Sequence, residues 1–409
     1  MDVVLFIHGV LDSSSAFVEL ARELEEAFSA NDDGQSIILL GIDSPGHGNS
    51  TSSSSSSSST SPTSTSILRY EDCALRVLET MECIRDDVGG EVSFHLVGHS
   101  TGGKLGAAAA LLSAKHDKNA IPTRSACIKS LTLLDVLPLP FPNKLWKPIA
   151  ASIEMINSIP ISSLKSQQHV HKHLFNVPMP SKLRDLISIS TKHDENGQSA
   201  WSFDIQSIIA SMNELQGFGV AGRKFEGPVL LCRADAAKSS YVTDNTLQMV
   251  RDTCLPNTEV FNAPKGTGHW LHKQASKEVA QSIVTFININ RIGGSSANST
   301  STSTSTSTST STSSTSSDAP LIHVKARLGE LHAVKRIVEQ DIGGTRIDIT
   351  STCGKTGLMR ASQWNHLQIV KYLHEQGSDI YARDKDGNTA LDLAKREGHT
   401  EVVQYLKKF

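Results

Sequence analysis

Six short apolar runs, each followed by polar or turn-forming residues, constrain the fold of this chain more than any other feature. The runs occupy residues 3–7, 36–42, 92–98, 128–135, 228–233 and 258–264. Apolar residues recur at helical spacing over residues 17–28 and 67–81, between these runs. Strands that are apolar along their whole length are buried on both faces, as in a parallel sheet with helices on each side. The sequence therefore predicts an α/β fold built on a doubly wound, mostly parallel sheet.

Two runs composed almost entirely of Ser and Thr interrupt the 409 residues, at residues 49–66 and 293–317. Neither run can bury a hydrophobic core. We expect the first to be an enlarged surface loop, because it lies inside the α/β pattern and the cost of loop closure rises only slowly with length. The second separates segments of different character. We therefore predict an α/β domain over residues 1–290, a disordered linker over residues 291–317 and a second domain over residues 318–409.

The interval between the fourth and fifth apolar runs, about residues 136–227, is too long to be a plain crossover between two strands. It contains helix-like pieces and a proline-rich segment at residues 137–142. In open α/β sheets, ligands bind at the carboxyl ends of the strands. We expect this interval to form a helical cap over that edge of the sheet.

The strongest chemical signal is the segment GHSTGG at residues 98–103, which lies between an apolar run and the helix-like stretch KLGAAAALL. A nucleophile on a sharp strand-to-helix turn needs neighbours without side chains, so that strand and helix can approach closely. This context predicts Ser100 as a serine nucleophile. It also places the amide of Thr101 at a helix N-terminus, where it can donate to a developing oxyanion. We expect the amide of Val10, in the HGVL segment after the first run, to complete this oxyanion hole.

The general base and the acid of a catalytic triad are expected later in the chain. His269 lies in the segment KGTGHW after the last apolar run, and a histidine can accept the serine proton and return it near neutral pH. Asp135 and Asp235 each end or follow an apolar run, and both satisfy the chain order Ser, Asp, His. We favour Asp135 as the residue that fixes the tautomer of His269, and keep Asp235 as the alternative acid.

Several segments together resemble the alpha/beta-hydrolase esterases of the bacterial and mitochondrial small-acyl type, over about residues 3–289. They are VVLFIHG, GIDSPGHGNS, LVGHSTGG, LTLLDVLP, WSFDIQSI, GPVLLCRADAAKSSYV and GTGHWLH. The resemblance implies hydrolysis of a small or medium acyl ester or thioester. It also favours Asp135, because the acid follows the sixth strand in some relatives and Asp235 lies too close to its strand for the common arrangement. The chain departs from this family in lacking two leading strands and in carrying the Ser/Thr run at residues 49–66.

The C-terminal segment repeats itself after 33 residues. The shift relates Gly354 to Gly387, Thr356 to Thr389, Leu358 to Leu391, Ala361 to Ala394, His366 to His399, Val370 to Val403, Tyr372 to Tyr405 and Leu373 to Leu406. This period resembles that of ankyrin repeats, with an earlier imperfect copy at residues 321–340. About three repeats predict a small all-α domain near the minimum size for a stacked core, which binds an unidentified protein partner. We discard the triplet GKT at residues 354–356 as a phosphate loop, because its upstream glycine is absent.

Composition argues against several other kinds of protein. The net charge is −3 and the basic residues are scattered, so we expect no nucleic-acid partner. The six cysteines show no short spacings, and His169, His171 and His173 have no carboxylate or thiol beside them, so we predict neither a metal site nor a cofactor. No membrane span, signal peptide or transit peptide is recognisable. We expect a cytoplasmic protein, and a mitochondrial location stays open if the N-terminus is incomplete.

Two functions fit these observations. As an enzyme, the chain would be a serine esterase or thioesterase that carries an interaction module. As a binding protein, it would be a catalytically inert hydrolase-fold platform whose ankyrin repeats act as an adaptor. All three residue types of a Ser-His-Asp triad are present at usable positions, which favours the enzyme.

Overall fold

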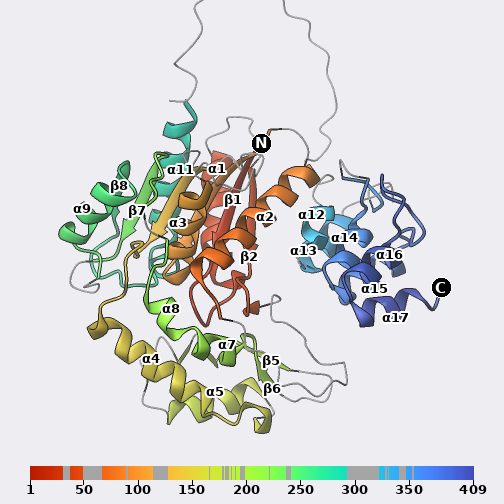
Figure 1. The fold of residues 1–409 in the computed structure, drawn as a ribbon, viewed down its shortest axis with the longest axis horizontal. Helices are drawn as coiled ribbons and strands as arrows, with labels where there is room; N and C mark the ends of the chain where they lie inside the picture. Colours follow the sequence, from red (N-terminus) through yellow and green to blue (C-terminus); the bar gives the residue numbers. More distant parts are fainter. Residues whose placement is uncertain are drawn as a thin grey trace, which may run out of the picture. The chain divides into compact units, whose positions relative to one another are not determined.

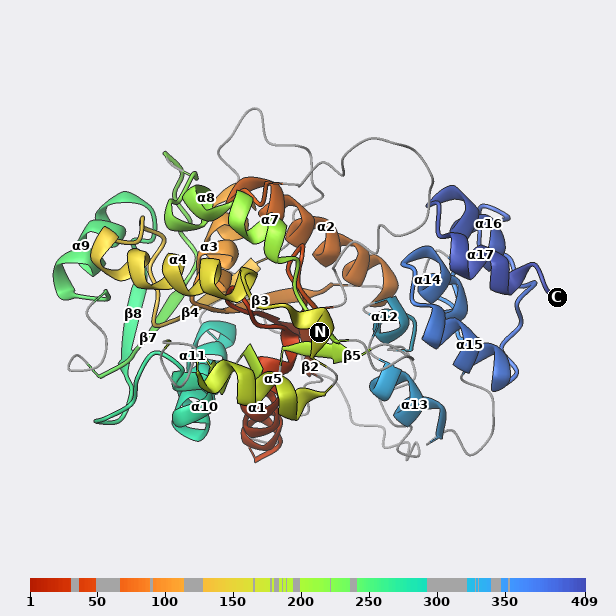
Figure 2. The same cartoon turned by 90° about the horizontal axis from the view of Figure 1, so that it is seen from below.

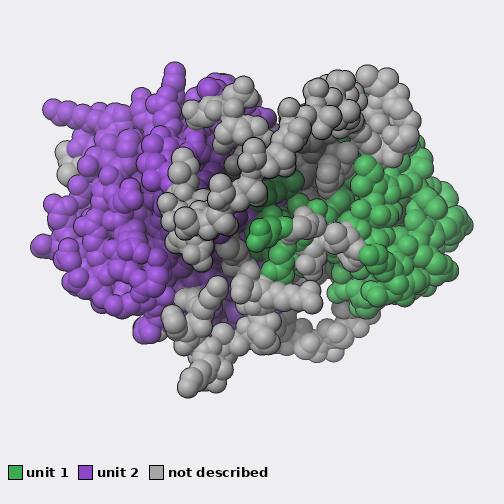
Figure 3. All heavy atoms as spheres, turned by 90° about the horizontal axis from the view of Figure 1, so that it is seen from above, with its two compact units in different colours: residues 1, 80–92, 297–409 green, residues 2–79, 93–296 purple. Residues whose placement is uncertain are grey.

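The computed structural model describes residues 1–30, 37–48, 67–88, 91–113, 128–164, 166–176, 179, 184–185, 187–188, 190–193, 199–220, 222–235, 241–292, 322–327, 329, 331–339, 347–351 and 354–409. Both Ser/Thr runs, which we expect to be a loop and a linker, lie outside these residues. The chain forms two compact units (Figure 3). Unit 2 consists of residues 2–79 and 93–296, and unit 1 of residues 1, 80–92 and 297–409.

A six-stranded parallel sheet forms the centre of unit 2, with the strand order β2-β1-β3-β4-β7-β8 (Figure 1). The strands are β1 (Asp2–Ile7), β2 (Ile37–Ile42), β3 (Ser93–His99), β4 (Ile128–Leu134), β7 (Val229–Arg233) and β8 (Thr258–Asn262). Each strand coincides with one of the six apolar runs, so the predicted parallel sheet is confirmed. β1 is buried along its whole length, and β3 and β4 are buried after their first one or two residues, because helices cover both faces.

Helices lie on both faces of the sheet. They are α1 (Val18–Ala30), residues 70–79 of α2 (Tyr70–Val88), α3 (Thr101–Ser113), α9 (Asp244–Thr253), α10 (Leu271–Gln274) and α11 (Ser276–Ile292), with a 3-10 turn at Ser14–Phe17. Figure 2 shows α1 and α11 on one face and α3 with the start of α2 on the other. The core under α1 and α11 includes Phe6, whose ring stacks on Phe17 with 5.1 Å between centroids. Among the described helices, none is both long and apolar enough to cross a membrane.

The chain between β4 and β7 forms a cap on one side of the sheet (Figure 1). Its elements are α4 (Asn143–Asn157), a 3-10 turn at Ile161–Ser163, α5 (Gln167–Phe175), β5 (Thr191–His193), β6 (Ser199–Trp201), α7 (Ile205–Ala210) and α8 (Met212–Gln216). The Ser190 hydroxyl donates to the carbonyl of Leu11, which follows β1, over 3.1 Å. The cap therefore lies at the carboxyl ends of the strands, as the sequence predicts. The antiparallel pair β5–β6 was not expected.

Three pairs of short helices form the C-terminal part of unit 1. They are α12 (Ile322–Arg327), α13 (Leu331–Glu339), α14 (Gly357–Gln363), α15 (Leu367–Glu375), α16 (Ala390–Arg396) and α17 (Thr400–Leu406). The hydroxyls of Thr356 and Thr389 cap α14 and α16 by accepting from the amides three residues further on. Leu358, Leu393 and other fully buried apolar side chains form a single core along the stack.

Candidate active site

Ser100 lies on a sharp turn between β3 and α3, in the left-handed backbone region with φ 54°. Its carbonyl accepts from the amides of Gly103 and Lys104 at 3.0 and 3.2 Å. A Cβ atom on Gly98 would lie 2.5 Å from the Gly102 carbonyl oxygen, and one on Gly102 would collide with the carbonyls of Ile7 and His8. The glycines of GHSTGG are therefore required by the close approach of strand, helix and neighbouring loop, which is the geometry of a nucleophile elbow.

Asp135 directly follows β4, and His269 lies in the loop after β8; the two side chains are in contact. The Nδ1 atom of His269 lies 2.8 Å from Oδ2 of Asp135. The Asp135 side chain is 1% exposed and that of His269 is 35% exposed. The other carboxylate oxygen, Oδ1, accepts from the amide of Ala234 at 3.1 Å. In a neutral imidazole this contact keeps the proton on Nδ1 and leaves Nε2 free to accept one.

Asp235 occupies a different place. Its Oδ2 atom accepts from the amide of Gly266 at 2.7 Å, and its own amide donates to the carbonyl of Thr267 at 2.9 Å. Both contacts are with the backbone of the loop that carries His269. The structure therefore places Asp135 against the His269 ring and Asp235 against the loop behind it.

His99 links this loop to the elbow. Its Nε2 atom lies 3.0 Å from the carbonyl oxygen of His269, to which it donates, and the two ring centroids are 4.7 Å apart. The centroid of the His99 ring also lies 4.3 Å from that of His272. Burial, and then the neighbouring His272 and His269, lower the pKa of His99 well below its usual value. The neutral His99 ring, one residue before Ser100, thus holds the backbone of His269 by this hydrogen bond.

The loop after β1 lies against the elbow. A Cβ atom on Gly9 would be 3.3 Å from the Cβ of Ser100. The amide of Val10 donates to the Thr101 hydroxyl oxygen at 2.7 Å, and Thr101 is the first residue of α3. The two residues expected to form an oxyanion hole are therefore neighbours, and the Val10 amide is directed at the Thr101 side chain.

Comparison with known proteins gives two family matches. The profile described as "Alpha/beta hydrolase family" matches residues 4–282. The chain belongs to the alpha/beta hydrolase family. A second profile, "Ankyrin repeats (3 copies)", matches residues 322–408 of this alpha/beta hydrolase, so the predicted combination of hydrolase and ankyrin repeats is confirmed.

Individual relatives cover the two parts separately. The "sn-1-specific diacylglycerol lipase ABHD11" of Danio rerio is 23% identical over 288 residues, which are 69% of this chain and 78% of that protein. The "Ankyrin repeat and SAM domain-containing protein 6" of Rattus norvegicus is 39% identical over 80 residues, which are 19% of this chain and 9% of that protein. The solved structure titled "Marine microorganism esterase" covers 69% of this hydrolase and 94% of its own chain, with a TM-score of 0.53 and 24% identity, and shows the same fold.

Two buried histidines brace the loop after β1 of this alpha/beta hydrolase, and sequence reasoning missed both. Nε2 of His8 accepts from the amide of Ser44 at 2.9 Å, and its Nδ1 lies 2.8 Å from the Gly9 carbonyl. Nε2 of His47 accepts from the amide of Leu11 at 3.3 Å. Burial, and then His8, lower the pKa of His47 to about 3, so the ring stays neutral and able to accept. The HG and GHG segments were the available signal, but the pairing of their loops was not visible in the sequence.

Lys104 is a second feature that the sequence did not reveal. It lies one turn after Ser100 on α3 and is fully buried. Its Nζ donates to the carbonyls of Gln216 and Gly217 at 3.3 and 3.0 Å and lies 3.5 Å from the ring centroid of Phe141. Burial lowers the pKa of Lys104 from its ordinary 10.5 to about 6. This side chain connects the elbow helix to the cap.

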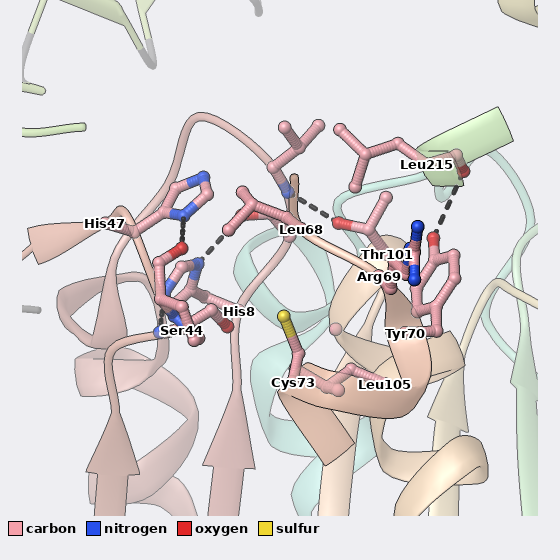
Figure 4. A pocket seen from close by; sticks show the side chains of 14 residues that line it. His8, Ser44, His47, Leu68, Arg69, Tyr70, Cys73, Thr101, Leu105 and Leu215 are labelled. Atoms are coloured by element: carbon pink, nitrogen blue, oxygen red, sulfur yellow. Dashed lines mark hydrogen bonds between the residues drawn. The ribbon is translucent and has the colours of Figure 1, made fainter. Parts of the chain in front are cut away.

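A cavity lies beside the predicted oxyanion residues (Figure 4). It encloses about 400 Å³ of empty space, part of which is open to solvent. The loops after β1 and β2 form part of its walls. The start of α2, α3 and α8 form the rest. The lining side chains that face it include Leu68, Tyr70, Leu105 and Leu215. The space is mostly apolar and small, with Thr101 at its border.

Proposed function

We propose that this chain is a serine hydrolase that cleaves a small or medium acyl ester or thioester. The observation that carries the proposal is the hydrogen bond between His269 and a buried Asp135, in a chain that also holds Ser100 on a sharp strand-to-helix turn. A histidine base needs a partner that orients its ring and stabilises its protonated form. The buried Asp135 carboxylate can do both, because the Ala234 amide holds it and it is directed at Nδ1 of His269. The pairing supports Asp135 over Asp235 as the acid.

The reaction follows from these positions. The Ser100 hydroxyl attacks the substrate carbonyl carbon while Nε2 of His269 takes the hydroxyl proton. The oxyanion of the tetrahedral intermediate is stabilised at the N-terminus of α3. When the intermediate collapses, the carbonyl re-forms, the bond to the alkoxide or thiolate breaks, and His269 gives its proton to that leaving group. A water molecule, deprotonated by His269, then hydrolyses the acyl-enzyme and regenerates Ser100.

The cavity supports the substrate class. Its apolar walls suit a short acyl group, and its position next to Val10 and Thr101 suits a carbonyl held at the elbow. The names of two similar proteins, a diacylglycerol lipase and an esterase, also describe ester hydrolases. We assign the ankyrin repeats the binding of a protein partner, because stacked repeats present their surface to partners and bring no chemistry of their own.

Labelling by a fluorophosphonate probe tests the proposal directly. We expect the purified full chain to be labelled and to turn over p-nitrophenyl acetate or butyrate, and Ser100→Ala to lose both activities. Ser113→Ala, at the far end of the same helix, is the matched control and should keep them. A folded wild-type chain, judged by circular dichroism, that is neither labelled nor active would overturn the enzyme assignment and leave the inert platform with its ankyrin adaptor.

A further inference from the structure

We propose that the hydroxyl of Thr101 is itself a hydrogen-bond donor to the oxyanion, and that the Val10 amide acts through it. The inference rests on the proposed serine hydrolase function and deepens it. It changes one of the two donors of the oxyanion hole. The Thr101 amide remains a donor, and the Thr101 hydroxyl takes the place of the Val10 amide as the second.

The first observation is the hydrogen bond from the Val10 amide to the Thr101 hydroxyl oxygen, at 2.7 Å. A backbone amide has one proton to give, so an amide committed to this contact is not free to donate to the substrate. A hydroxyl has one proton to give and two lone pairs. Since Thr101 accepts from Val10, its own proton remains to be donated. Among the described residues, that proton has no acceptor.

The second observation is where this hydroxyl lies. Thr101 directly follows Ser100 and begins α3, so its hydroxyl belongs to the same residue as the expected amide donor. Thr101 is 7% exposed, and its side chain borders the small apolar cavity (Figure 4). A hydroxyl without an acceptor in such a place costs free energy until a ligand accepts from it. An oxyanion formed on the carbon that Ser100 attacks is the ligand with the right charge and position.

The third observation is that the loop bearing Val10 is fixed. The amide of Leu11, the next residue, donates to His47, and the Gly9 carbonyl contacts His8. Both contacts hold the peptide groups on either side of Val10, so its amide keeps its direction toward Thr101. Val10 is therefore a positioning residue. Its amide orients and polarises the hydroxyl, which strengthens the bond that the hydroxyl donates.

The test compares Thr101→Val, which keeps the shape and removes the hydroxyl, with Thr101→Ser, which keeps the hydroxyl. Fluorophosphonate titration counts active sites, so that kcat for p-nitrophenyl butyrate is expressed for each intact site. We expect Thr101→Val to lower kcat on the order of 10²-fold while KM changes only a few-fold, because the lost bond forms in the transition state. Thr101→Ser should stay within a few-fold of wild type, as should Thr285→Val, an exposed control on α11.

Binding of a trifluoromethyl ketone adds a second readout. It forms a hemiketal with the serine whose oxygen occupies the oxyanion position, so its affinity should fall in Thr101→Val by about the same factor as kcat. If Thr101→Val does not fold, Thr101→Ala carries the same comparison without added bulk. A Thr101→Val or Thr101→Ala enzyme with wild-type or higher kcat would overturn the inference, since the hydroxyl would then only obstruct a hole served by the Val10 amide. Failure of the proposed function is distinct, because it shows in wild type itself.

Discussion

The ankyrin repeats and the candidate active site are built by opposite means. In the repeats, the same contact recurs along the chain: the amide of His366 donates to Ala361 and that of His399 to Ala394, both at 2.9 Å. In the site, each decisive contact occurs once and joins residues far apart in sequence. Asp135 and His269 are separated by 134 positions, and Val10 and Thr101 by 91. A short sequence pattern that repeats is enough to build the stacked helices of the repeats. The geometry of the site depends on contacts between distant residues, and these form only when the whole domain is folded.

The largest effect is expected from breaking one of the distant contacts. Asp135→Asn should lower kcat about 10⁴-fold, because an amide facing Nδ1 favours the wrong tautomer of His269. Asp235→Asn should lower kcat less than about 10-fold, because Oδ2 of Asp235 accepts from the Gly266 amide of the loop that carries His269, whereas Asp135 is the carboxylate against the imidazole. Steady-state turnover of p-nitrophenyl butyrate measures both variants. The reverse order of the two losses would make Asp235 the acid.

A core truncation in the repeats should have a local effect instead. Leu393→Ala removes a fully buried side chain from the stacked core and should cost about 2–5 kcal/mol of unfolding free energy. Leu391, which is half-buried on the same helix, is the matched control and should lose less when changed to Ala. Hydrogen exchange measured by mass spectrometry should show faster exchange first in α14 to α17. Equal acceleration in β1 and β3 would mean that the repeats do not open separately.

Lys104 provides a pH-dependent test of the contact between elbow helix and cap. Between pH 6 and 10.5 the unfolded chain holds the Lys104 proton and the folded protein releases it, so this group makes unfolding free energy rise with pH. The slope is at most about 1.4 kcal/mol for each pH unit. We expect Lys104→Met to lack this contribution. Urea unfolding at pH 7 and pH 9 should show a difference from wild type that grows with pH.

The control for this measurement is Lys144→Met, on an exposed lysine of α4. Its difference from wild type should be the same at both pH values. A difference between wild type and Lys104→Met that does not change from pH 7 to pH 9 would contradict the low pKa of Lys104 in the folded protein.

The smallest effect is expected at a repeated cap. Thr389→Ala should cost about 1 kcal/mol, because the hydroxyl satisfies the amide of Asp392 at the start of α16. Thr400→Ala, at an exposed position in the next helix, should be close to neutral. Thermal unfolding of the two variants, followed by circular dichroism, makes the comparison. Equal losses would remove the capping role from Thr389.

The fold was largely predictable because its determinants are local. All six apolar runs became strands, although the third strand continues one residue further, to His99. The pair β5–β6 was missed because each strand has three residues, too few for an alternating pattern to stand out. The helical repeats were visible because identical residues recur 33 positions apart.

The site was predictable only in part. Ser100 and His269 are marked by glycine-rich segments of their own, which is why the sequence singles them out. The choice between Asp135 and Asp235 stayed open, because both follow strands and only the three-dimensional structure shows which carboxylate faces the imidazole. Lys104 looked like any lysine on a helix, since its partners at Phe141 and Gln216 belong to a segment folded back over it.

The placement of the cap has an evolutionary consequence. It is inserted between β4 and β7, which are neighbours in the sheet, with Leu134 level with Cys232 and Leu131 level with Val229. The cap therefore begins at the carboxyl end of β4 and ends at the amino end of the neighbouring β7, about one strand length away. A segment joined to its host at two such nearby points can be lengthened, shortened or replaced without re-threading the strands. Lineages that share this sheet are free to diversify in substrate choice while the residues at the strand ends stay where they are.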